Sequence, residues 1–147
     1  MNILLATRSD GTNPFAIELM KMLKQKISIA VSEKEFWNPS HTYDIVHFQW
    51  PEEFFNWNTP SPAELDAFIK QLKSFKLTSK LVWTVHNKWP YDFGREKGIQ
   101  FYTKLIPHFD AFLHLGSSGV DIFKALYNEK INRAALHKII PHLQFQT

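Results

Sequence analysis

A histidine that directly follows an apolar run is the residue of this sequence best placed for chemistry. His86 follows residues 81–85, Leu-Val-Trp-Thr-Val, and precedes Asn87. Because such a run is typical of a strand buried in a parallel sheet, we expect the imidazole at the carboxyl edge of the sheet rather than in the core. There it could donate a hydrogen bond to a sugar hydroxyl or stabilise developing charge. The structural alternative is a hydrogen bond that orders its loop.

Residues 49–57 combine aromatic rings with carboxylates and amides directly after another apolar run. Aromatic rings stack on the apolar faces of pyranoses, while carboxylates and amides bond to hydroxyls. The segment therefore predicts contacts with a sugar acceptor, and we add one acid from the loop after His86. The predicted acceptor-binding residues are Trp50, Glu52, Glu53, Trp57 and Asp92. Packing over the sheet edge and contact with a membrane surface are the alternatives.

Two glycine-containing turns precede expected helices and offer backbone N–H groups to a phosphate. One contains Gly11 and Thr12, and the other places Ser117 and Ser118 after Gly116. Neither turn has the GxGxxG or the GxxxxGK[ST] fingerprint, so a dinucleotide site and a P-loop are not supported. Ordinary capped turns explain the same residue types.

The remaining histidines show neither HxxxH nor HExxH spacing, and the chain has no cysteine. We therefore expect no metal site. His47 and His114 fall within apparent buried strands, where a hydrogen-bonded core histidine is the usual finding. No Ser-His-Asp or Cys-His spacing supports a hydrolase.

Composition limits the partners and the location. The net charge of +3 suits anionic ligands, but Lys and Arg are scattered rather than clustered, so we expect no nucleic-acid partner. No apolar segment approaches the ~20 residues of a membrane span, and no leader is evident. The absence of cysteine fits a reducing compartment. The expected location is cytoplasmic, with peripheral contact at the inner face of a membrane left open.

Apolar runs and alternating segments predict six strands. They cover residues 3–6, 27–31, 43–48, 80–85 and 111–115, and the last begins at 138. Helices are expected after the turn signals at Asn13-Pro14 and Ser61, through residues 99–109, and after residue 116. For 147 residues this order predicts one α/β domain, a Rossmann-like, doubly wound and mostly parallel sheet with helices on both faces.

Four motifs, taken together and in order, resemble the N-terminal half of family 4 glycosyltransferases. They are residues 43–52 (YDIVHFQWPE), residues 81–87 (LVWTVHN) followed by Pro90 and Asp92, residues 110–118, and residues 137–142 (HKIIPH). The resemblance covers nearly the whole chain, and the order and intervals of the motifs make it specific.

The resemblance implies a retaining, two-domain GT-B enzyme. Such an enzyme transfers a sugar from a nucleotide-sugar donor, which is a substrate and not a cofactor, to a glycan or lipid-linked acceptor without an obligatory metal. Residues 1–147 would be the acceptor-side domain. By resemblance, His86 contacts the donor sugar, and the other residues near the donor phosphates and sugar are Gly11, Thr12, Asn87, Ser117 and Ser118.

Two departures from the family pattern affect these expectations. The family usually has a glycine and a linker after the Ile-Pro-His stretch, whereas Leu143 follows here and the sequence ends at Thr147. We therefore expect that the C-terminal donor-binding domain is absent, that it is needed in cis or in trans, and that this domain alone turns over little. The first loop also has only Gly11 where the family often has two adjacent glycines. The alternative function is a non-catalytic carbohydrate- or anion-binding module, or a subunit of a split glycosyltransferase.

Overall fold

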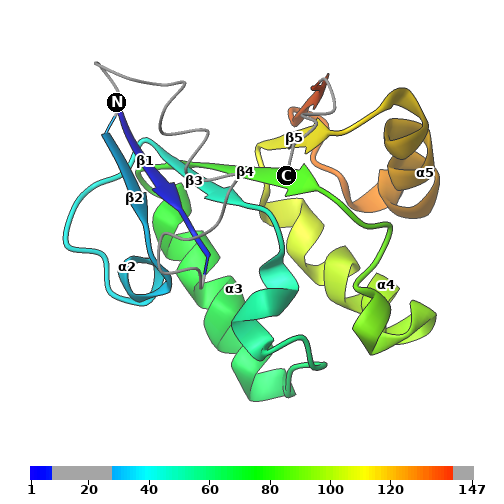
Figure 1. Ribbon diagram of the computed structural model, residues 1–147, viewed down its shortest axis with the longest axis horizontal. Helices are drawn as coiled ribbons and strands as arrows, with labels where there is room; N and C mark the ends of the chain where they lie inside the picture. The colour runs from blue at the N-terminus through cyan, green and yellow to red at the C-terminus, as the bar shows by residue number, and fades with distance from the viewer. Residues whose placement is uncertain (8–27, 141–147) are drawn as a thin grey trace, which may run out of the picture.

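The protein contains one six-stranded sheet, in which every pair of neighbouring strands is parallel (Figure 1). The computed structural model describes residues 1–7 and 28–140. The strands are β1 (Asn2–Leu5), β2 (Ser28–Val31), β3 (Ile45–Phe48), β4 (Lys80–Val85), β5 (Ala111–His114) and β6 (Leu136–Ile139). The predicted α/β class with a mostly parallel sheet is confirmed.

The strand order is β2-β1-β3-β4-β5-β6, so the chain changes direction across the sheet at β1. In such doubly wound sheets the crevice beyond the carboxyl ends, where the order reverses, is the usual place for ligands. Here that crevice lies between β1 and β3. A single strand stands beyond β1, which is the flavodoxin-type start 2-1-3 rather than the 3-2-1 start of the Rossmann order.

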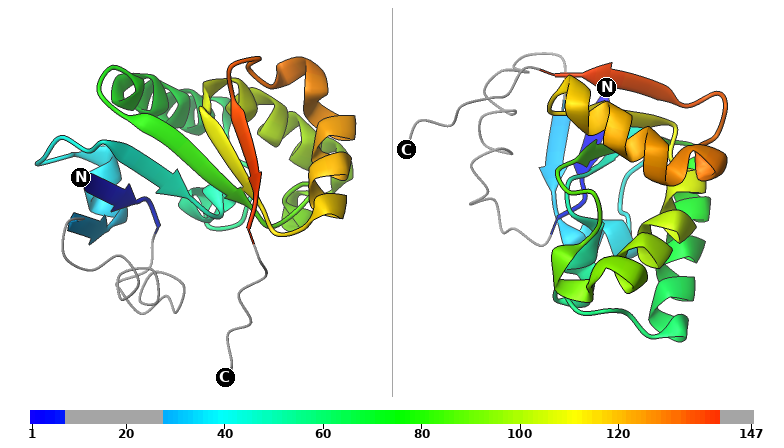
Figure 2. Two further views of the ribbon diagram at one scale, coloured as in Figure 1. Left: turned by 90° about the horizontal axis from the view of Figure 1, so that it is seen from above. Right: turned by 90° about the vertical axis from the view of Figure 1, so that its right-hand side faces the viewer.

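The helices in the described part of the chain cover one face of the sheet (Figure 2). They are α2 (Glu33–Trp37), α3 (Pro62–Lys76), α4 (Arg95–Leu105) and α5 (Ser117–Tyr127), with short 3₁₀ segments η1 (Pro51–Phe55), η2 (Tyr91–Phe93), η3 (Ile106–His108) and η4 (Asn128–Lys130). The opposite face carries a smaller apolar cluster around Ile3 and Leu5. The helix expected after Asn13, on which the prediction of helices on both faces depends, lies outside the described residues.

The main core forms because one row of side chains on each strand faces these helices. Val46 pairs with Leu81, and Phe48 pairs with Trp83, which in turn pairs with Phe112. All five side chains are completely buried. Aromatic rings dominate this core, and edge-to-face contacts such as Trp83 on Tyr102, with ring centroids 4.6 Å apart, add to the area that they bury.

The capping box predicted at Ser61 is confirmed. The Glu64 amide donates to Ser61 Oγ at 3.2 Å, and the Ser61 amide donates to Glu64 Oε1 at 2.9 Å. These bonds satisfy two N–H groups that have no partner within the helix, and the apolar stripe of α3 then buries Phe68 and Leu72. The helix therefore begins where the sequence indicates.

Strand bounds differ from the prediction by at most two residues, whereas two helices differ by more. The connection before β3 contains α2, which is only five residues long and buries one side chain, Phe36, so that no helical period is visible. The helix predicted through residues 99–109 is α4, which ends at Leu105. Pro107 lacks the N–H that an α-helix needs, so the chain tightens into η3 there. Strand β6 begins at Leu136, two positions before the predicted start.

Candidate functional site

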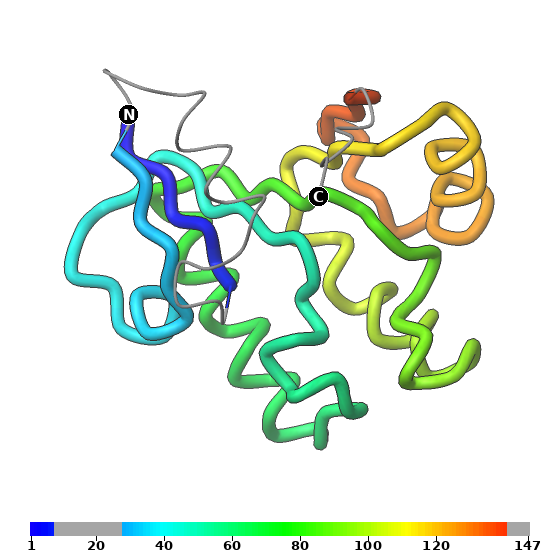
Figure 3. Tube along the Cα trace, viewed as in Figure 1, coloured from blue at the N-terminus to red at the C-terminus, as the bar shows by residue number. Residues whose placement is uncertain are grey.

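The carboxyl ends of β3 and β4 bring His86 next to the segment that follows β3. Figure 3 traces the chain from β3 through η1 into α3, and from β4 through η2 into α4. His86 comes one residue after β4, and its Nε2 lies 3.1 Å from Oε1 of Gln49, which comes one residue after β3. The two strands pair in register up to Phe48 and Trp83, so Gln49 continues opposite Thr84 and His86 lies two residues further along, on the same face of the sheet.

Burial lowers the pKa of His86 to about 4, so the ring is neutral at pH 7. The oxygen of a glutamine side chain only accepts, so Nε2 carries the ring proton and donates to Gln49. Nδ1 is then the acceptor of the ring. His86 is therefore suited to accept a hydrogen bond from a hydroxyl through Nδ1, whereas the sequence predicted that it would donate a hydrogen bond or stabilise developing charge.

Trp50 stacks on one face of the His86 imidazole. The two rings are stacked, with centroids 4.3 Å apart and planes 20° from parallel. Trp57 approaches Trp50 with a centroid distance of 6.5 Å and is 41% exposed. Asn56 and Trp57 both have left-handed backbone conformations, with φ values of 54° and 61°, which turn the chain sharply after η1. The structure thus places an exposed indole beside the stacked pair.

Glu52 is not at the surface. Its side chain is 1% exposed, and Oε2 accepts a hydrogen bond of 2.9 Å from the hydroxyl of Tyr102 on α4. Burial raises the pKa of Glu52 to about 7. The sequence predicted an acceptor contact here, but the buried carboxyl is turned into the core and instead ties η1 to α4. The neighbouring Glu53 is half-buried, and it remains a candidate for acceptor contact.

A second histidine, His47 on β3, lies close to His86. His47 Nε2 is 2.6 Å from Thr84 Oγ1, and both side chains are buried on the sheet face opposite the helices. Burial, and to a smaller degree the nearby His86, lowers the pKa of His47 to about 4. His114 Nε2 similarly lies 3.0 Å from His137 Nδ1. Both strand histidines therefore have hydrogen-bond partners, as expected for core histidines.

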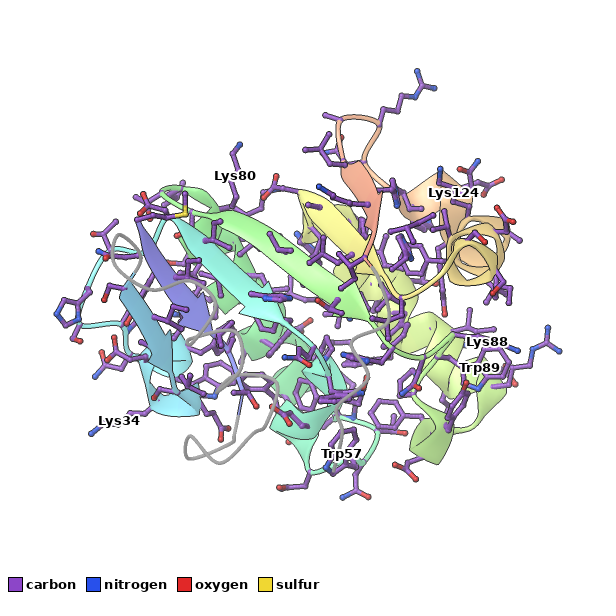
Figure 4. The ribbon with its side chains drawn as sticks, turned by 45° about the horizontal axis from the view of Figure 1, so that its top comes forward. Lys34, Trp57, Lys80, Lys88, Trp89 and Lys124 are labelled. Atoms are coloured by element: carbon purple, nitrogen blue, oxygen red, sulfur yellow. The ribbon has the colours of Figure 1, made fainter. Side chains whose placement is uncertain are left out.

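The loop after β4 and the first residue of α4 together form an aromatic and cationic surface. Lys88 and Arg95 lie over the ring of Trp89, at 5.9 and 5.6 Å from its centroid, and Tyr91 meets Trp89 edge-on at 6.0 Å. Figure 4 shows Lys88, Trp89 and Trp57 on the side toward which the strand arrows point. Asp92 is exposed in the same loop. These groups form a surface that differs in chemistry from the stacked His86 pair.

The remaining predicted donor-side residues are spread along the same edge. Asn87 is half-buried after His86, and Ser117 and Ser118 are exposed in the first turn of α5. The N-cap of α5 is Gly116, and no side chain caps this helix. Gly11 and Thr12 lie outside the described residues. The structure thus brings together the predicted residues that follow β3 and β4. The two serines lie beyond the end of the neighbouring strand, β5.

Several residues of this site carried no signal in the sequence. Tyr102 falls on the apolar stripe of its helix, so its spacing indicated packing and not a hydroxyl aimed at a carboxyl 50 positions away. Tyr127 similarly donates from α5 to the carbonyl oxygen of Lys88 at 2.5 Å. In the sequence, Gln49 was one residue of a polar and aromatic segment. Nothing in the sequence indicated that its side chain would contact His86, which lies 37 positions further along.

Within residues 1–7 and 28–140, no group of three or more His, Cys, Asp or Glu side chains is arranged to hold a metal ion. In the same ranges, no helix has the length and apolar character needed to cross a membrane.

No protein-family model matches the chain, and no curated protein matches it significantly. The fold and the site therefore define the class: an α/β domain with one all-parallel sheet and a stacked His–Trp pair at its carboxyl edge. What such a site does follows from its chemistry.

Proposed function

We propose that this chain is the acceptor-side domain of a retaining GT-B glycosyltransferase, which transfers a sugar from a nucleotide-sugar donor to a glycan or lipid-linked acceptor. The observation that carries the proposal is the stacked Trp50–His86 pair at the carboxyl ends of β3 and β4. A neutral imidazole beside exposed aromatic surface suits a sugar ring, which has both hydroxyls and apolar faces. The resemblance of residues 43–52 and 81–87 to the family supports the same function.

In this proposal each group has a defined part. Nδ1 of His86 accepts a hydrogen bond from a hydroxyl of the donor sugar, while Trp50 holds the ring in place. Trp57 stacks on the acceptor, and Glu53 and Asp92 accept hydrogen bonds from acceptor hydroxyls. The donor phosphates would be contacted from the backbone and side chains of Gly11, Thr12, Asn87, Ser117 and Ser118.

The proposal requires a second, donor-binding domain, in cis or in trans. The leaving nucleotide diphosphate carries charge that needs donors from both sides of the cleft. The nucleotide sugar is the substrate, and the proposed chemistry uses no cofactor. The proposed location is cytoplasmic.

The test combines this chain with candidate donor-binding domains and measures sugar transfer from a panel of nucleotide sugars. Once transfer is found, His86→Ala should reduce kcat/KM by roughly 10²-fold, the order found when one stabilising contact of a transition state is removed. His41→Ala is the matched control, because His41 is exposed on the connection before β3. Equal rates for the two variants would exclude the proposed part of His86.

A non-catalytic carbohydrate-binding module is the second candidate, and the exposed ring of Trp57 next to Trp50 favours it. Glycan binding to the isolated chain, measured by calorimetry, separates the two. In a binding module, Trp57→Ala abolishes glycan binding, His86→Ala leaves it unchanged, and no donor domain produces transfer.

Peripheral membrane contact is part of the proposal when the acceptor is lipid-linked. Trp89, Tyr91, Lys88 and Arg95 supply the aromatic and cationic groups that suit an anionic headgroup region. Sedimentation with vesicles containing anionic lipid should detect it, and the double change of Lys88 and Arg95 to Gln should abolish it. Equal pelleting of the double variant would argue against this surface.

A further inference from the structure

A pocket of about 660 Å³ lies between α5, η4 and the first residues of β6. Because the strands are parallel, this pocket at the amino end of β6 belongs to the edge of the sheet opposite to the one that carries the Trp50–His86 pair. A volume of this size is in the range that small organic ligands occupy. Most of the side chains that line it are polar or charged, which favours a polar ligand.

Two cations line the pocket. They are Lys124 on α5 and Arg133 in the turn before β6, and neither forms an ion pair within the described part of the chain. Figure 4 shows Lys124 where α5 lies beside β6. Its charge helps to lower the pKa values of His114 and His137, for which burial is the larger cause, so the ammonium group lies near both rings. Positive charge that is concentrated in a concave site attracts anions.

His137 adds a hydrogen-bonding group whose ring is held in place. Its Nδ1 lies 3.0 Å from Nε2 of His114, which is 1% exposed. The imidazole of His137 also stacks on Phe112, with centroids 5.2 Å apart and planes 16° from parallel. Nε2 is therefore the nitrogen of His137 that remains for a ligand. When His114 donates the hydrogen bond between the rings, Nε2 of His137 carries its proton, and an anion in the pocket would favour this arrangement.

The carboxyl end of α5 opposes an anion, because a helix has partial negative charge at that end. Its carbonyl oxygens already accept hydrogen bonds: the Asn128 amide donates to the carbonyl oxygen of Lys124, and the Ile131 amide donates to that of Tyr127 at 3.3 Å. The charge at an exposed helix end is also partial, whereas Lys124 and Arg133 each carry a full positive charge. The two cations therefore outweigh the helix end.

The rest of the polar lining suits hydroxyl groups. Glu129 on η4 supplies an acceptor. Oδ1 of Asn132 accepts a hydrogen bond of 2.9 Å from the Ala134 amide, so the side-chain N–H groups are the part of Asn132 left for a ligand. A phosphate group fills only part of a pocket of about 660 Å³, so a larger ligand would reach these groups as well.

We propose that this pocket binds the phosphate group of a small hydroxylated compound, such as a sugar phosphate. Lys124, Arg133 and Nε2 of His137 donate charge-assisted hydrogen bonds to the phosphate oxygens. Glu129 and Asn132 bond to the hydroxyls. The site uses no residue of the stacked ring pair at the other edge of the sheet, so it stands or falls independently of the proposed function.

The test titrates the ¹⁵N-labelled chain with glucose 6-phosphate, inorganic phosphate and glucose, at pH 7 and constant ionic strength, and follows the backbone amide signals by NMR. Glucose 6-phosphate should shift the signals of residues 124–137 and bind more tightly than inorganic phosphate, and glucose should shift none of them. Lys124→Gln should weaken the binding of glucose 6-phosphate about tenfold, the order expected for loss of one hydrogen bond between charged groups. Lys124→Arg keeps the charge and should retain most of the affinity.

Two further measurements separate a phosphate site from a general effect of charge. Lys70→Gln, on the exposed surface of α3, is the matched control and should bind glucose 6-phosphate as the wild type does. Bound phosphate should also raise the pKa of His137, because an anion beside the ring stabilises its charged form. The proposal is overturned if the shifts lie only in the segments after β3 and β4, if Lys124→Gln binds as tightly as Lys70→Gln, or if the pKa of His137 does not rise. Equal affinity for glucose 6-phosphate and inorganic phosphate would overturn the assignment of a hydroxylated ligand.

Discussion

Replacing Glu52 with glutamine should make the protein more stable than the wild type at alkaline pH. Burial raises the pKa of Glu52 from 4.5 to about 7, so the folded protein binds this proton more tightly than the unfolded chain does. A raised carboxyl pKa stabilises the fold below about pH 4.5, and this contribution is lost as pH rises through 7. The glutamine side chain keeps the shape of the neutral acid and has no proton to lose.

The magnitude follows from the pKa shift. A change of about 2.5 pKa units corresponds to ~3–4 kcal/mol when each unit is worth ~1.4 kcal/mol, and most of it should be lost between pH 5 and 8. Urea unfolding of both proteins at several pH values measures this directly as the difference between their free energies of unfolding. The histidines that titrate in the acid range are common to both proteins, so their contribution cancels in that difference.

A constant difference between the two proteins from pH 5 to 8 would refute the reasoning, because it would mean that Glu52 is already ionised or already hydrated in the folded protein. Glu129→Gln is the control. It alters an exposed carboxyl on η4 that is not among the groups shifting the pKa of Glu52, and it should change the free energy of unfolding by no more than a few tenths of a kcal/mol.

Three further predictions concern stability. Ser61→Ala should cost ~1 kcal/mol in urea unfolding, because it removes the cap of α3, whereas Ser117→Ala should change little, because Ser117 caps nothing. Gly98→Ala should destabilise by ~1–2 kcal/mol, since its new Cβ would lie 3.0 Å from Cβ of Trp89, while Gly119→Ala on open helix surface should not destabilise; equal thermal midpoints for the two would contradict this. Because the pKa of His47 is lowered to about 4, the free energy of unfolding should fall as pH drops from 6.5 toward 4. His47→Gln should remove roughly 1.5–2 kcal/mol of this fall between pH 6.5 and 5. An unchanged acid unfolding curve would count against this prediction.

His86 differs from most histidines that are proposed as functional groups, because burial keeps its ring neutral at pH 7. Many histidines are proposed as functional because they titrate near neutral pH, but His86 is desolvated and its pKa is about 4. In the proposed function, His86 acts at pH 7 as a neutral ring that Gln49 fixes in one tautomer. Gln49→Leu should therefore weaken ligand binding through loss of ring orientation, with the pH dependence of binding above pH 6 unaltered.

The sequence by itself determined the elements and the edge at which the site lies. The largely apolar run predicted β4 over its observed bounds, Lys80–Val85, because a strand covered on both faces is mostly apolar along its length. The Ser61 capping box predicted the start of α3 for the equally local reason that its bonds join residues three apart. Since these strands are parallel, the place of His86 at their carboxyl edge followed directly.

Only the tertiary structure decided what the side chains of that edge do. Glu52 and Trp50 are two positions apart and of the types that bind sugars, yet one is buried beneath Tyr102 and the other is stacked on His86. Their partners lie 50 and 36 positions further along the chain, and periodicity within a segment carries no information about a contact of that range. The protonation of Glu52 and His86 follows from the same burial, so the chemistry of this site was settled when the helices packed on the sheet.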